Sequence, residues 1–436
     1  MERAGPQTMH FGPGAPLRGT TQVPGDKSIS HRALMLAALA AGRSRIEGLC
    51  DGGDMAATVS ALRAMGARIE LAGDKAMEVD GVGVGALLQP ARAIDLGNSG
   101  TSARLLMGLA ASHPLTLTFT GDASLSRRPM ERVAAPLRRT GAEILTAPGG
   151  TLPVTVRGLC PAVPQTTRLA IASAQVKSAL LFAGLNMPGT TRVVEPVATR
   201  DHGERLLKLF GADIAAEGDE IVLRGEAELR PQLLSVPGDP SAAAFLVVAA
   251  LVVPGSGVRI EGVCINPRRV GLFAVLKEMG ADIAFENERE ASGEPVADIV
   301  ARHSALRAVE VPPELVPAMI DEFPIFFVAA AFAEGTSRAR GLAELRVKES
   351  DRIAAMAAGL AAIGVQGEES DEGLAVRGSA GEPIAGGATV AARMDHRIAM
   401  SFAVAGLHAR APVGIDDLSA AATSYPGFAE TLRSLT

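Results

Sequence analysis

The stretch Val23-Pro-Gly-Asp-Lys-Ser28 recurs as Val236-Pro-Gly-Asp-Pro-Ser241, an offset of 213 residues. Two further stretches recur 214 residues later: Arg45-Ile-Glu-Gly-Leu-Cys50 as Arg259-Ile-Glu-Gly-Val-Cys264, and Met65-Gly-Ala-Arg-Ile69 as Met279-Gly-Ala-Asp-Ile283. Matches that keep one order and nearly one offset indicate that the chain consists of two similar halves. We therefore expect one domain over residues 23–236. The second domain is discontinuous, over residues 1–22 plus 237–436.

A shorter period runs through both halves. Helix-like stretches end at a glycine and are followed by a β-branched stretch, as in Ala67-Arg-Ile-Glu-Leu71. These glycines recur at intervals of about 70–84 residues, at Gly66, Gly141, Gly211, Gly280 and Gly364. Each half is therefore predicted to repeat one α/β unit about three times.

The composition is that of a globular protein and excludes several classes. The 436 residues are 47% hydrophobic and 21% charged, and the formal charge of −6 gives no general attraction to nucleic acid or anionic membranes. The longest wholly apolar run, residues 242–253, is too short to span a bilayer. Three cysteines predict neither a disulfide framework nor a metal site, and the N-terminus has no targeting pattern. We expect a soluble, cytoplasmic protein.

Basic and hydroxyl residues gather where helices are predicted to begin. The stretch Asp26-Lys-Ser-Ile-Ser-His-Arg32 opens a helix whose predicted apolar face is Ile29, Ala33, Leu36 and Ala40. Lys27, Ser28 and Arg32 follow its first free N–H groups, which favours binding of an anion. Taken alone, the same pattern is also typical of a capped helix with solvated basic side chains.

The stretch Asp95-Leu-Gly-Asn-Ser-Gly-Thr-Ser-Ala-Arg104 places a glycine-rich turn before a helix predicted to begin near Thr101. It lacks the residues of a Walker A or dinucleotide motif, so it predicts either close approach to a ligand or a tight structural turn. Five further starts carry similar side chains, at Arg127-Arg-Pro-Met130, Ser173-Ala-Gln-Val-Lys-Ser178, Arg200-Asp-His-Gly-Glu-Arg205, Arg346-Val-Lys-Glu-Ser-Asp-Arg352 and Asp395-His-Arg-Ile398. Seven such starts predict a cleft for highly anionic ligands, because Arg binds phosphate and carboxylate in a bidentate manner.

These motifs resemble those of the EPSP synthase (3-phosphoshikimate 1-carboxyvinyltransferase) family over nearly the whole chain. The resemblance implies an α/β fold of two similar domains, each of three βαβαββ-type units, an inside-out α/β barrel. It implies no metal and no organic cofactor. The implied reaction transfers the enolpyruvyl group of phosphoenolpyruvate to the 5-hydroxyl of shikimate 3-phosphate, by addition and elimination. The motifs that carry the resemblance are Pro24-Gly-Asp-Lys-Ser28, Leu96-Gly-Asn-Ser-Gly-Thr101, Arg128-Pro-Met130, Ser173-Ala-Gln175, Val347-Lys-Glu-Ser-Asp-Arg352 and Asp395-His-Arg397.

The resemblance also implies which side chains bind the two substrates, shikimate 3-phosphate mainly on the 23–236 domain and phosphoenolpyruvate, with the general base, on the other. The residues implied for shikimate 3-phosphate are Lys27, Ser28, Arg32, Ser173, Ala174, Gln175, Arg200, Asp321 and Lys348. Those implied for phosphoenolpyruvate are Lys27, Asn98, Gly100, Arg128, Gln175, Arg352 and Arg397.

Four residues are implied to take part in the chemistry itself. Asp321, in Ile320-Asp-Glu-Phe-Pro324, matches the general base that accepts the 5-hydroxyl proton. Glu349 is implied to handle the proton at C3 of phosphoenolpyruvate, and Lys27 to contact phosphoenolpyruvate. Lys348 is implied to stabilise charge, and the sequence leaves open whether Lys348 or Glu349 delivers the proton. Addition to an enol ether needs an acid at carbon and a base at the attacking oxygen, which agrees with this assignment. As a turn residue before Pro324, Asp321 has a purely structural alternative.

The chain departs from the commoner family pattern at one position. Many members carry a Lys before a Thr-Phe-Pro-like segment, whereas Ala422-Thr-Ser-Tyr-Pro426 has none. This resembles class II members, some of which tolerate glyphosate and carry Ala where this chain has Gly100. Because Gly100 leaves room for an inhibitor longer than phosphoenolpyruvate, we expect glyphosate to inhibit.

Two other functions remain open on the sequence. UDP-N-acetylglucosamine 1-carboxyvinyltransferases share the fold and chemistry but commonly use a loop cysteine, whereas Cys50, Cys160 and Cys264 have the pattern of structural residues. A non-catalytic anion-binding protein on the same scaffold would not need Asp321 or Glu349. The expected partners are the small-molecule substrates, and we expect a monomer.

Overall fold

The computed structural model describes residues 8–436. The chain forms two compact units, which we call unit 1 and unit 2. Unit 2 comprises Gly25–Val236 and the short segment Glu290–Glu294. Unit 1 comprises the described residues up to Pro24, together with Pro237–Arg289 and Pro295–Thr436.

Two stretches lie in the other unit from the one that the expected division gives them: Val23 and Pro24, which belong to unit 1, and the short segment, which belongs to unit 2. The short segment includes the turn between β16 (Asp282–Ala291) and β17 (Glu294–Arg302). In it the Glu294 carboxylate accepts from His202 Nδ1 at 2.7 Å, and both side chains are buried in unit 2. Residues 1–7 of the expected 1–22 segment lie outside the described residues.

Unit 2 contains three four-stranded sheets of one pattern, in which two parallel strands are followed by an antiparallel pair. One repeat runs β6 (Ile94–Asp95), α3 (Gly100–Ala111), β7 (Thr116–Thr120), α4 (Glu131–Arg138), β8 (Glu143–Ala147), β9 (Thr151–Arg157). The next runs β10 (Thr166–Arg168), α5 (Ala174–Gly184), β11 (Thr190–Val194), α6 (His202–Leu209), β12 (Ile214–Glu217), β13 (Glu220–Arg224). Both have the predicted βαβαββ order.

The remaining repeat of unit 2 is closed by a strand from the end of the unit. Its chain order is α1 (Lys27–Leu39), β3 (Gly42–Glu47), α2 (Gly53–Ala64), β4 (Arg68–Leu71), β5 (Met77–Gly81). The missing first strand is β14 (Leu233–Ser235), which pairs in parallel with β3. Unit 2 therefore has three equivalent repeats.

Unit 1 begins with the same arrangement and then departs from it. Its first repeat is β2 (Arg18–Thr21), α7 (Pro240–Val252), β15 (Gly257–Cys264), α8 (Gly271–Glu278), β16 and β17. The second is α9 (Phe323–Phe332), β18 (Thr336–Ala339), α10 (Arg352–Ala362), β19 (Gly367–Ser370), β20 (Gly373–Arg377), with only isolated parallel bridges at Arg307 and Glu310 in place of a first strand.

The third repeat of unit 1 lacks the closing hairpin. It consists of β21 (Ile384–Gly386), β22 (Thr389–Val390), α11 (His396–Gly406), β23 (Ala409–Ala411), β24 (Val413–Ile415), α12 (Phe428–Leu435). In its place β1 (Met9–Phe11), from near the start of the chain, pairs antiparallel with β24. The βαβαββ prediction is therefore complete in unit 2 and only partial in unit 1.

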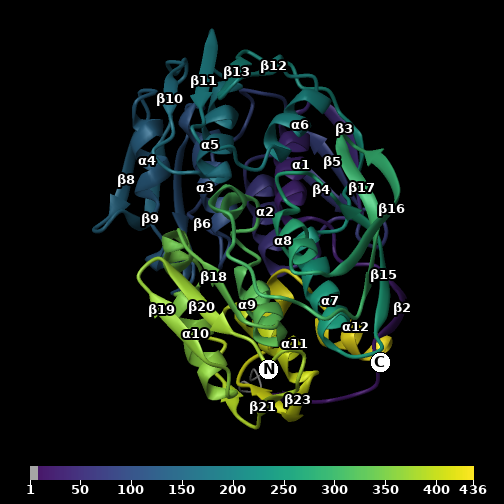
Figure 1. The fold of residues 1–436 in the computed structure, drawn as a ribbon. Coiled ribbons are helices and arrows are strands. Elements are labelled where there is room, and N and C mark those ends of the chain that lie inside the picture. The colour runs from purple at the N-terminus through teal and green to yellow at the C-terminus, as the bar shows by residue number, and fades with distance from the viewer. Residues whose placement is uncertain (1–7) are drawn as a thin grey trace, which may run out of the picture. The chain divides into compact units, whose positions relative to one another are not determined.

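In each unit three helices are buried almost all round. In unit 2 these are α1, α3 and α5, and Figure 1 shows α3 beside α5. In unit 1 they are α7, α9 and α11. The amphipathic interpretation of α1 is therefore wrong, because every residue from Ile29 to Leu39 is buried, including His31 and Arg32. A helix enclosed by its neighbours has no solvent face to keep polar.

The local signals at helix ends are mostly confirmed. The five predicted C-terminal glycines all have positive φ angles, between +84° and +102°, which a residue with a Cβ adopts only with strain. One start is wrong: the proline of Arg127-Arg-Pro-Met130 suits a first helical position, but Pro129 lies before α4, which begins at Glu131. Among the described residues, no helix is long and apolar enough to cross a membrane.

Candidate active site

In unit 2, the start of α1 carries three of the predicted side chains. The buried Asp26 carboxylate caps the helix by accepting from the Ile29 N–H at 2.9 Å. Asp26 is therefore the N-cap residue of α1, and Ser28 is not. Lys27 Nζ lies 2.5 Å from the carboxylate of Asp54 on α2. Asp54 was not predicted as a site residue, because nothing in its local sequence relates it to Lys27.

Arg32 joins α1 to α5, where three more predicted residues lie. Its guanidinium donates to Ser178 Oγ at 2.9 and 3.1 Å and to the Ser28 carbonyl at 3.0 Å. A longer bond of 3.4 Å reaches the Ala174 carbonyl. Ser173 caps α5 by accepting from the Val176 N–H. The structure therefore brings these residues, predicted from distant motifs, to one place in unit 2.

The glycine-rich turn before α3 lies against two guanidinium groups. Ser99 caps α3, which begins at Gly100, one residue before the predicted start. A Cβ atom added at Gly100 would lie 3.0 Å from Arg104 Nη1 and 3.1 Å from Arg128 Nη1. Gly97 has a φ of +54°, so the turn uses both glycines. The turn is thus a close approach of backbone to cationic side chains.

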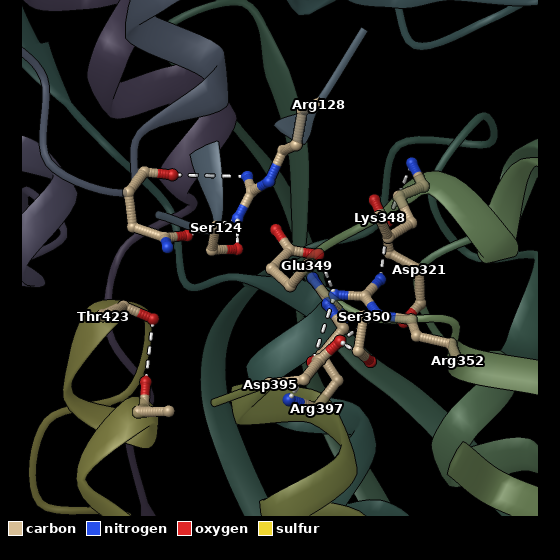
Figure 2. A network of polar contacts seen from close by, with 12 residues as sticks. Ser124, Arg128, Asp321, Lys348, Glu349, Ser350, Arg352, Asp395, Arg397 and Thr423 are labelled. Carbon is tan, nitrogen blue, oxygen red and sulfur yellow. Dashed lines mark hydrogen bonds and ion pairs between the residues drawn. The ribbon is translucent and has the colours of Figure 1, made fainter. Parts of the chain in front are cut away.

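Arg128 is held against this turn by Asn98 and Ser124. It donates to the Asn98 carbonyl at 3.3 Å, to the Asn98 side-chain oxygen, and to Ser124 Oγ at 3.2 Å, as Figure 2 shows for Ser124. The Asn98 amide in turn donates to Asp122 Oδ2 at 2.7 Å. The guanidinium predicted to bind phosphoenolpyruvate is therefore oriented before any ligand binds.

Gln175 is oriented by α3. Its side-chain oxygen accepts from Arg104 Nη1 at 2.8 Å, and its amide donates to Thr101 Oγ1 at 3.0 Å. Arg104 is buried and also reaches the Pro129 carbonyl. The sequence analysis noted Arg104 one turn into this helix but did not assign it to the site.

Arg200 lies just before α6, beside a buried ionic cluster that the sequence analysis missed. Lys177 Nζ lies 2.8 Å from Glu195 and 2.6 Å from Glu204. Thr199 donates to the second Glu195 oxygen. Burial raises the pKa of Glu204, although the Lys177 charge opposes this shift. The segment that carries Arg200 is therefore bound to Lys177 of α5 at both of its ends, Glu195 and Glu204.

In unit 1, three predicted residues gather around the Arg352 guanidinium, which is 1% exposed (Figure 2). Arg352 Nη2 lies 2.5 Å from Glu349 Oε2, and Nη1 lies 3.4 Å from Asp321 Oδ1. Lys348 Nζ lies 3.5 Å from the same Asp321 oxygen. Both predicted catalytic carboxylates therefore face cations.

Asp395 anchors this group from the start of α11. Its fully buried carboxylate accepts from Arg352 Nε at 2.8 Å, from Ser350 Oγ at 3.0 Å and from the Arg397 N–H at 3.0 Å. Burial alone would lower the pKa of Arg352, but Asp395, Glu349 and Asp321 together raise it well above its ordinary value. Arg352 therefore stays charged. The motif pointed to Asp395 only as a helix start.

Arg397 packs against the loop that carries Asp321. It donates to the Asp321 carbonyl at 2.9 Å and to Glu322 Oε1 at 3.4 Å. The buried Glu322 also accepts from Ser241, which accepts from Arg269 Nη2 at 2.9 Å. The loop that carries Asp321 is therefore also held by Glu322, Ser241 and Arg269. None of these three was predicted as a site residue.

The 422–426 segment near the C-terminus contains a local hydrogen bond, and the three cysteines differ in burial. Thr423 in Ala422-Thr-Ser-Tyr-Pro426 donates to the Ala420 carbonyl at 2.8 Å (Figure 2). Burial raises the pKa of Tyr425 to about 12. Cys50 and Cys264 are buried, and Cys160 is exposed.

Apart from Arg200, the predicted site residues thus gather in two neighbouring sets in unit 2 and one set in unit 1. In unit 2 the structure brings together Lys27, Ser28, Arg32, Ala174 and Ser173, and beside the Gly100 turn Asn98, Arg128 and Gln175. In unit 1 it brings together Asp321, Lys348, Glu349, Arg352 and Arg397. Arginine, lysine and hydroxyl groups at helix starts suit phosphate and carboxylate ligands, and paired carboxylates suit proton transfer.

Comparison with known proteins identifies the family. The family described as EPSP synthase (3-phosphoshikimate 1-carboxyvinyltransferase) matches residues 12–432. A 3-phosphoshikimate 1-carboxyvinyltransferase of Sphingopyxis alaskensis is 58% identical over 98% of this chain and 97% of its own length. One of Zymomonas mobilis is 58% identical over 96% and 94%. A solved EPSP synthase from Acinetobacter baumannii has a TM-score of 0.88 and 45% identity, covering 98% of both chains.

Proposed function

The chain belongs to the EPSP synthase family, and from that premise we propose which of its residues carry the family's reaction. The reaction transfers the enolpyruvyl group of phosphoenolpyruvate to the 5-hydroxyl of shikimate 3-phosphate and releases phosphate, a step of the shikimate pathway to aromatic amino acids. The observation that supports our assignment is the contact of Arg352 with both Asp321 and Glu349.

Shikimate 3-phosphate is proposed to bind mainly through unit 2. Helix starts with Arg, Lys and hydroxyl groups match a phosphate and a polyhydroxylated ring. Arg32 is already fixed by Ser178 and α5, which lowers the cost of ordering it on binding. The proposed contacts are Lys27, Ser28, Arg32, Ser173, Ala174, Gln175 and Arg200, with Asp321 and Lys348 contributed by unit 1.

Phosphoenolpyruvate carries a phosphate and a carboxylate, and its proposed contacts are mostly cationic. Arg128 is oriented by Asn98, and Arg352 by Asp395, so both guanidinium groups are positioned before binding. An anion bound to Arg352 would compete with Asp321 and Glu349 for its donors and release these carboxylates for proton transfer. The proposed contacts are Lys27, Asn98, Gly100, Arg128, Gln175, Arg352 and Arg397.

The proposed chemistry is an addition followed by an elimination. Asp321 takes the proton of the 5-hydroxyl group while the oxygen of that hydroxyl bonds to C2 of phosphoenolpyruvate. At the same time Glu349 delivers a proton to C3. In the second step the bond between C2 and the phosphate oxygen breaks, phosphate leaves with that oxygen, and C3 returns a proton to the Glu349 carboxylate. Lys27 stabilises the negative charge of the tetrahedral intermediate.

Three finer points belong to the same proposal. Glyphosate inhibits by taking the place of phosphoenolpyruvate beside Gly100, the protein acts as a monomer, and it acts in the cytoplasm. The cell-wall alternative, transfer to UDP-N-acetylglucosamine, has no support from the relatives described above, which are named 3-phosphoshikimate 1-carboxyvinyltransferase.

The test is phosphate release from phosphoenolpyruvate and shikimate 3-phosphate, with UDP-N-acetylglucosamine as the competing acceptor. We expect Asp321→Ala and Glu349→Ala each to lower kcat by about a hundred- to ten-thousandfold, the usual contribution of a positioned acid or base. The control is Glu368→Ala, which removes an exposed carboxylate from β19. Unchanged kcat in either active-site variant would overturn its role, and an equal loss in the control would mean nonspecific damage.

A further inference from the structure

Four buried side chains of unit 2 form a continuous chain of hydrogen bonds. His31 Nδ1 lies 2.7 Å from Thr58 Oγ1, Thr58 Oγ1 lies 2.6 Å from Ser102 Oγ, and Ser102 Oγ lies 2.6 Å from Ser99 Oγ. All four residues are 0% exposed. We call His31, Thr58, Ser102 and Ser99 the hydroxyl chain.

The hydroxyl chain connects α1 and α3, which carry proposed substrate contacts, through α2. His31 lies on α1 one turn after Lys27, and Thr58 lies on α2 one turn after Asp54. The pairs Lys27–Asp54 and His31–Thr58 therefore join α1 to α2 at successive turns. Ser102 lies on α3, and Ser99 is the N-cap of that helix. These two residues extend the connection to the turn that leads into α3 at Gly100.

The hydrogen atoms of this chain can be ordered in one direction. Ser99 Oγ accepts from the Ser102 N–H, and its own hydrogen then has Ser102 Oγ as acceptor. In this order Ser102 donates to Thr58, and Thr58 donates to His31 Nδ1 at 2.7 Å rather than to the Asp54 carbonyl at 3.5 Å. Burial and the nearby Lys27 lower the pKa of His31 to about 3, so its ring is neutral and Nδ1 can accept. Among the side-chain atoms of the hydroxyl chain, only His31 Nε2 has no hydrogen-bond partner within residues 8–436.

The duplicated half has apolar residues at the positions equivalent to two members of the hydroxyl chain. By the offsets of 213 and 214 residues, Ala244 is the equivalent of His31 and Leu272 is the equivalent of Thr58. Both are apolar and buried, on α7 and α8. A buried polar network costs desolvation that an apolar core avoids, and it sets relative positions more narrowly than apolar packing does.

We propose that the hydroxyl chain is a positioning network that holds the Gly100 turn in register with Lys27, so that both meet phosphoenolpyruvate together. This inference rests on the proposed assignment of Lys27 and Gly100 to that substrate. Shikimate 3-phosphate depends less on it, because Arg32 is held separately by Ser178. Loss of the hydroxyl chain should therefore affect the two substrates unequally.

The test uses Thr58→Val, which keeps the side-chain shape and removes the hydroxyl, and Thr58→Ser, which restores it. Ser102→Ala breaks the chain at the next link. The matched control is Thr140→Val, because Thr140 is also buried in unit 2 but donates only to the nearby Leu137 carbonyl. Each full-length variant is assayed by phosphate release for kcat and both KM values, and by thermal unfolding for folding.

We expect Thr58→Val and Ser102→Ala to raise KM for phosphoenolpyruvate about five- to tenfold, while KM for shikimate 3-phosphate changes less than about twofold. Thr58→Ser should be close to the wild type. Thr140→Val should lower the unfolding temperature and leave both KM values unchanged.

Unchanged KM for phosphoenolpyruvate in the folded variants would overturn the proposal, as would an equal rise in Thr140→Val. If neither variant folds, the hydroxyl chain is a requirement of folding and the positioning role is also overturned. Lys27→Met and Gly100→Ala test separately whether phosphoenolpyruvate binds beside these two residues. If those two also leave KM for phosphoenolpyruvate unchanged, the assignment of the substrate fails rather than the hydroxyl chain.

Discussion

Gly100 is the residue at which the smallest change should affect ligand choice. A methyl group there would meet Arg104 and Arg128 at 3.0 and 3.1 Å, close enough to displace both guanidinium groups by a few tenths of an ångström. We expect Gly100→Ala to weaken glyphosate inhibition by about tenfold or more, and to raise KM for phosphoenolpyruvate by a smaller factor, because the inhibitor is longer. Inhibition constants measured against phosphoenolpyruvate check this.

The matched control for this prediction is Gly53→Ala. Gly53 has ordinary helical φ and nothing within 4 Å of an added Cβ, so its substitution should leave both constants unchanged. Equal inhibition constants for the wild type and Gly100→Ala would contradict the steric explanation.

At the scale of the element, α11 and α10 are both capped by an aspartate that also binds an arginine, and the two ion pairs differ in burial. Asp395 caps α11 and pairs with the buried Arg352, whereas Asp351 caps α10 and pairs with the partly exposed Arg346. We expect Asp395→Asn to lower the free energy of unfolding by about 3 kcal/mol, because it leaves a buried charge with a weaker partner. Asp351→Asn should cost about 1 kcal/mol or less.

Urea unfolding of both variants measures this difference directly. Because each substitution keeps the shape and one oxygen of the cap, a difference between them reports the burial of the ion pair. Similar losses in the two variants would show that the pair at Asp395 contributes no more than an exposed one.

At the scale of the whole molecule, stability should depend on pH through His31. In the folded protein its pKa is lowered to about 3 by burial and by Lys27 and Arg32, against the opposing charge of Asp54. The unfolded chain binds this proton below about pH 6.5, so stability falls as pH decreases from 6.5 toward 3, by about 1.4 kcal/mol per unit.

The measurement is urea unfolding at pH 7 and pH 5, for the wild type and for His31→Asn, which keeps an acceptor near Nδ1. We expect the wild type to lose about 2 kcal/mol more than the variant between these values. Equal losses would mean that His31 is protonated in the folded protein or does not titrate in this range.

Features set by the backbone of a single segment could be predicted from the sequence. The five glycines after helices have positive φ because no other residue adopts that conformation without strain. Ser173 and Asp26 cap their helices because a short polar side chain reaches the free N–H groups of the next turn. The helix-start motifs and the 213-residue duplication likewise identified the family and the repeated α/β units.

Partners that come from distant segments could not be predicted. Arg32 and Ser178 are 146 residues apart in sequence, and Arg352 and Asp395 are 43 apart. No local pattern relates Lys27 to Asp54, or Thr58 to Ser102, because these contacts exist only after the helices have packed. The strand β14, which completes the first sheet of unit 2, and the Glu290–Glu294 segment are decided in the same way.

The amino-acid sequence by itself therefore determined the family, the twofold duplication, the helix starts and the candidate substrate contacts, because each depends on residue identity at short spacing. Only the tertiary structure decided which helices are enclosed, which carboxylates Arg352 holds, and how the Gly100 turn is joined to α1. The physical reason is that burial and long-range hydrogen bonds are properties of packed neighbours, and the chain brings those neighbours together only when it folds.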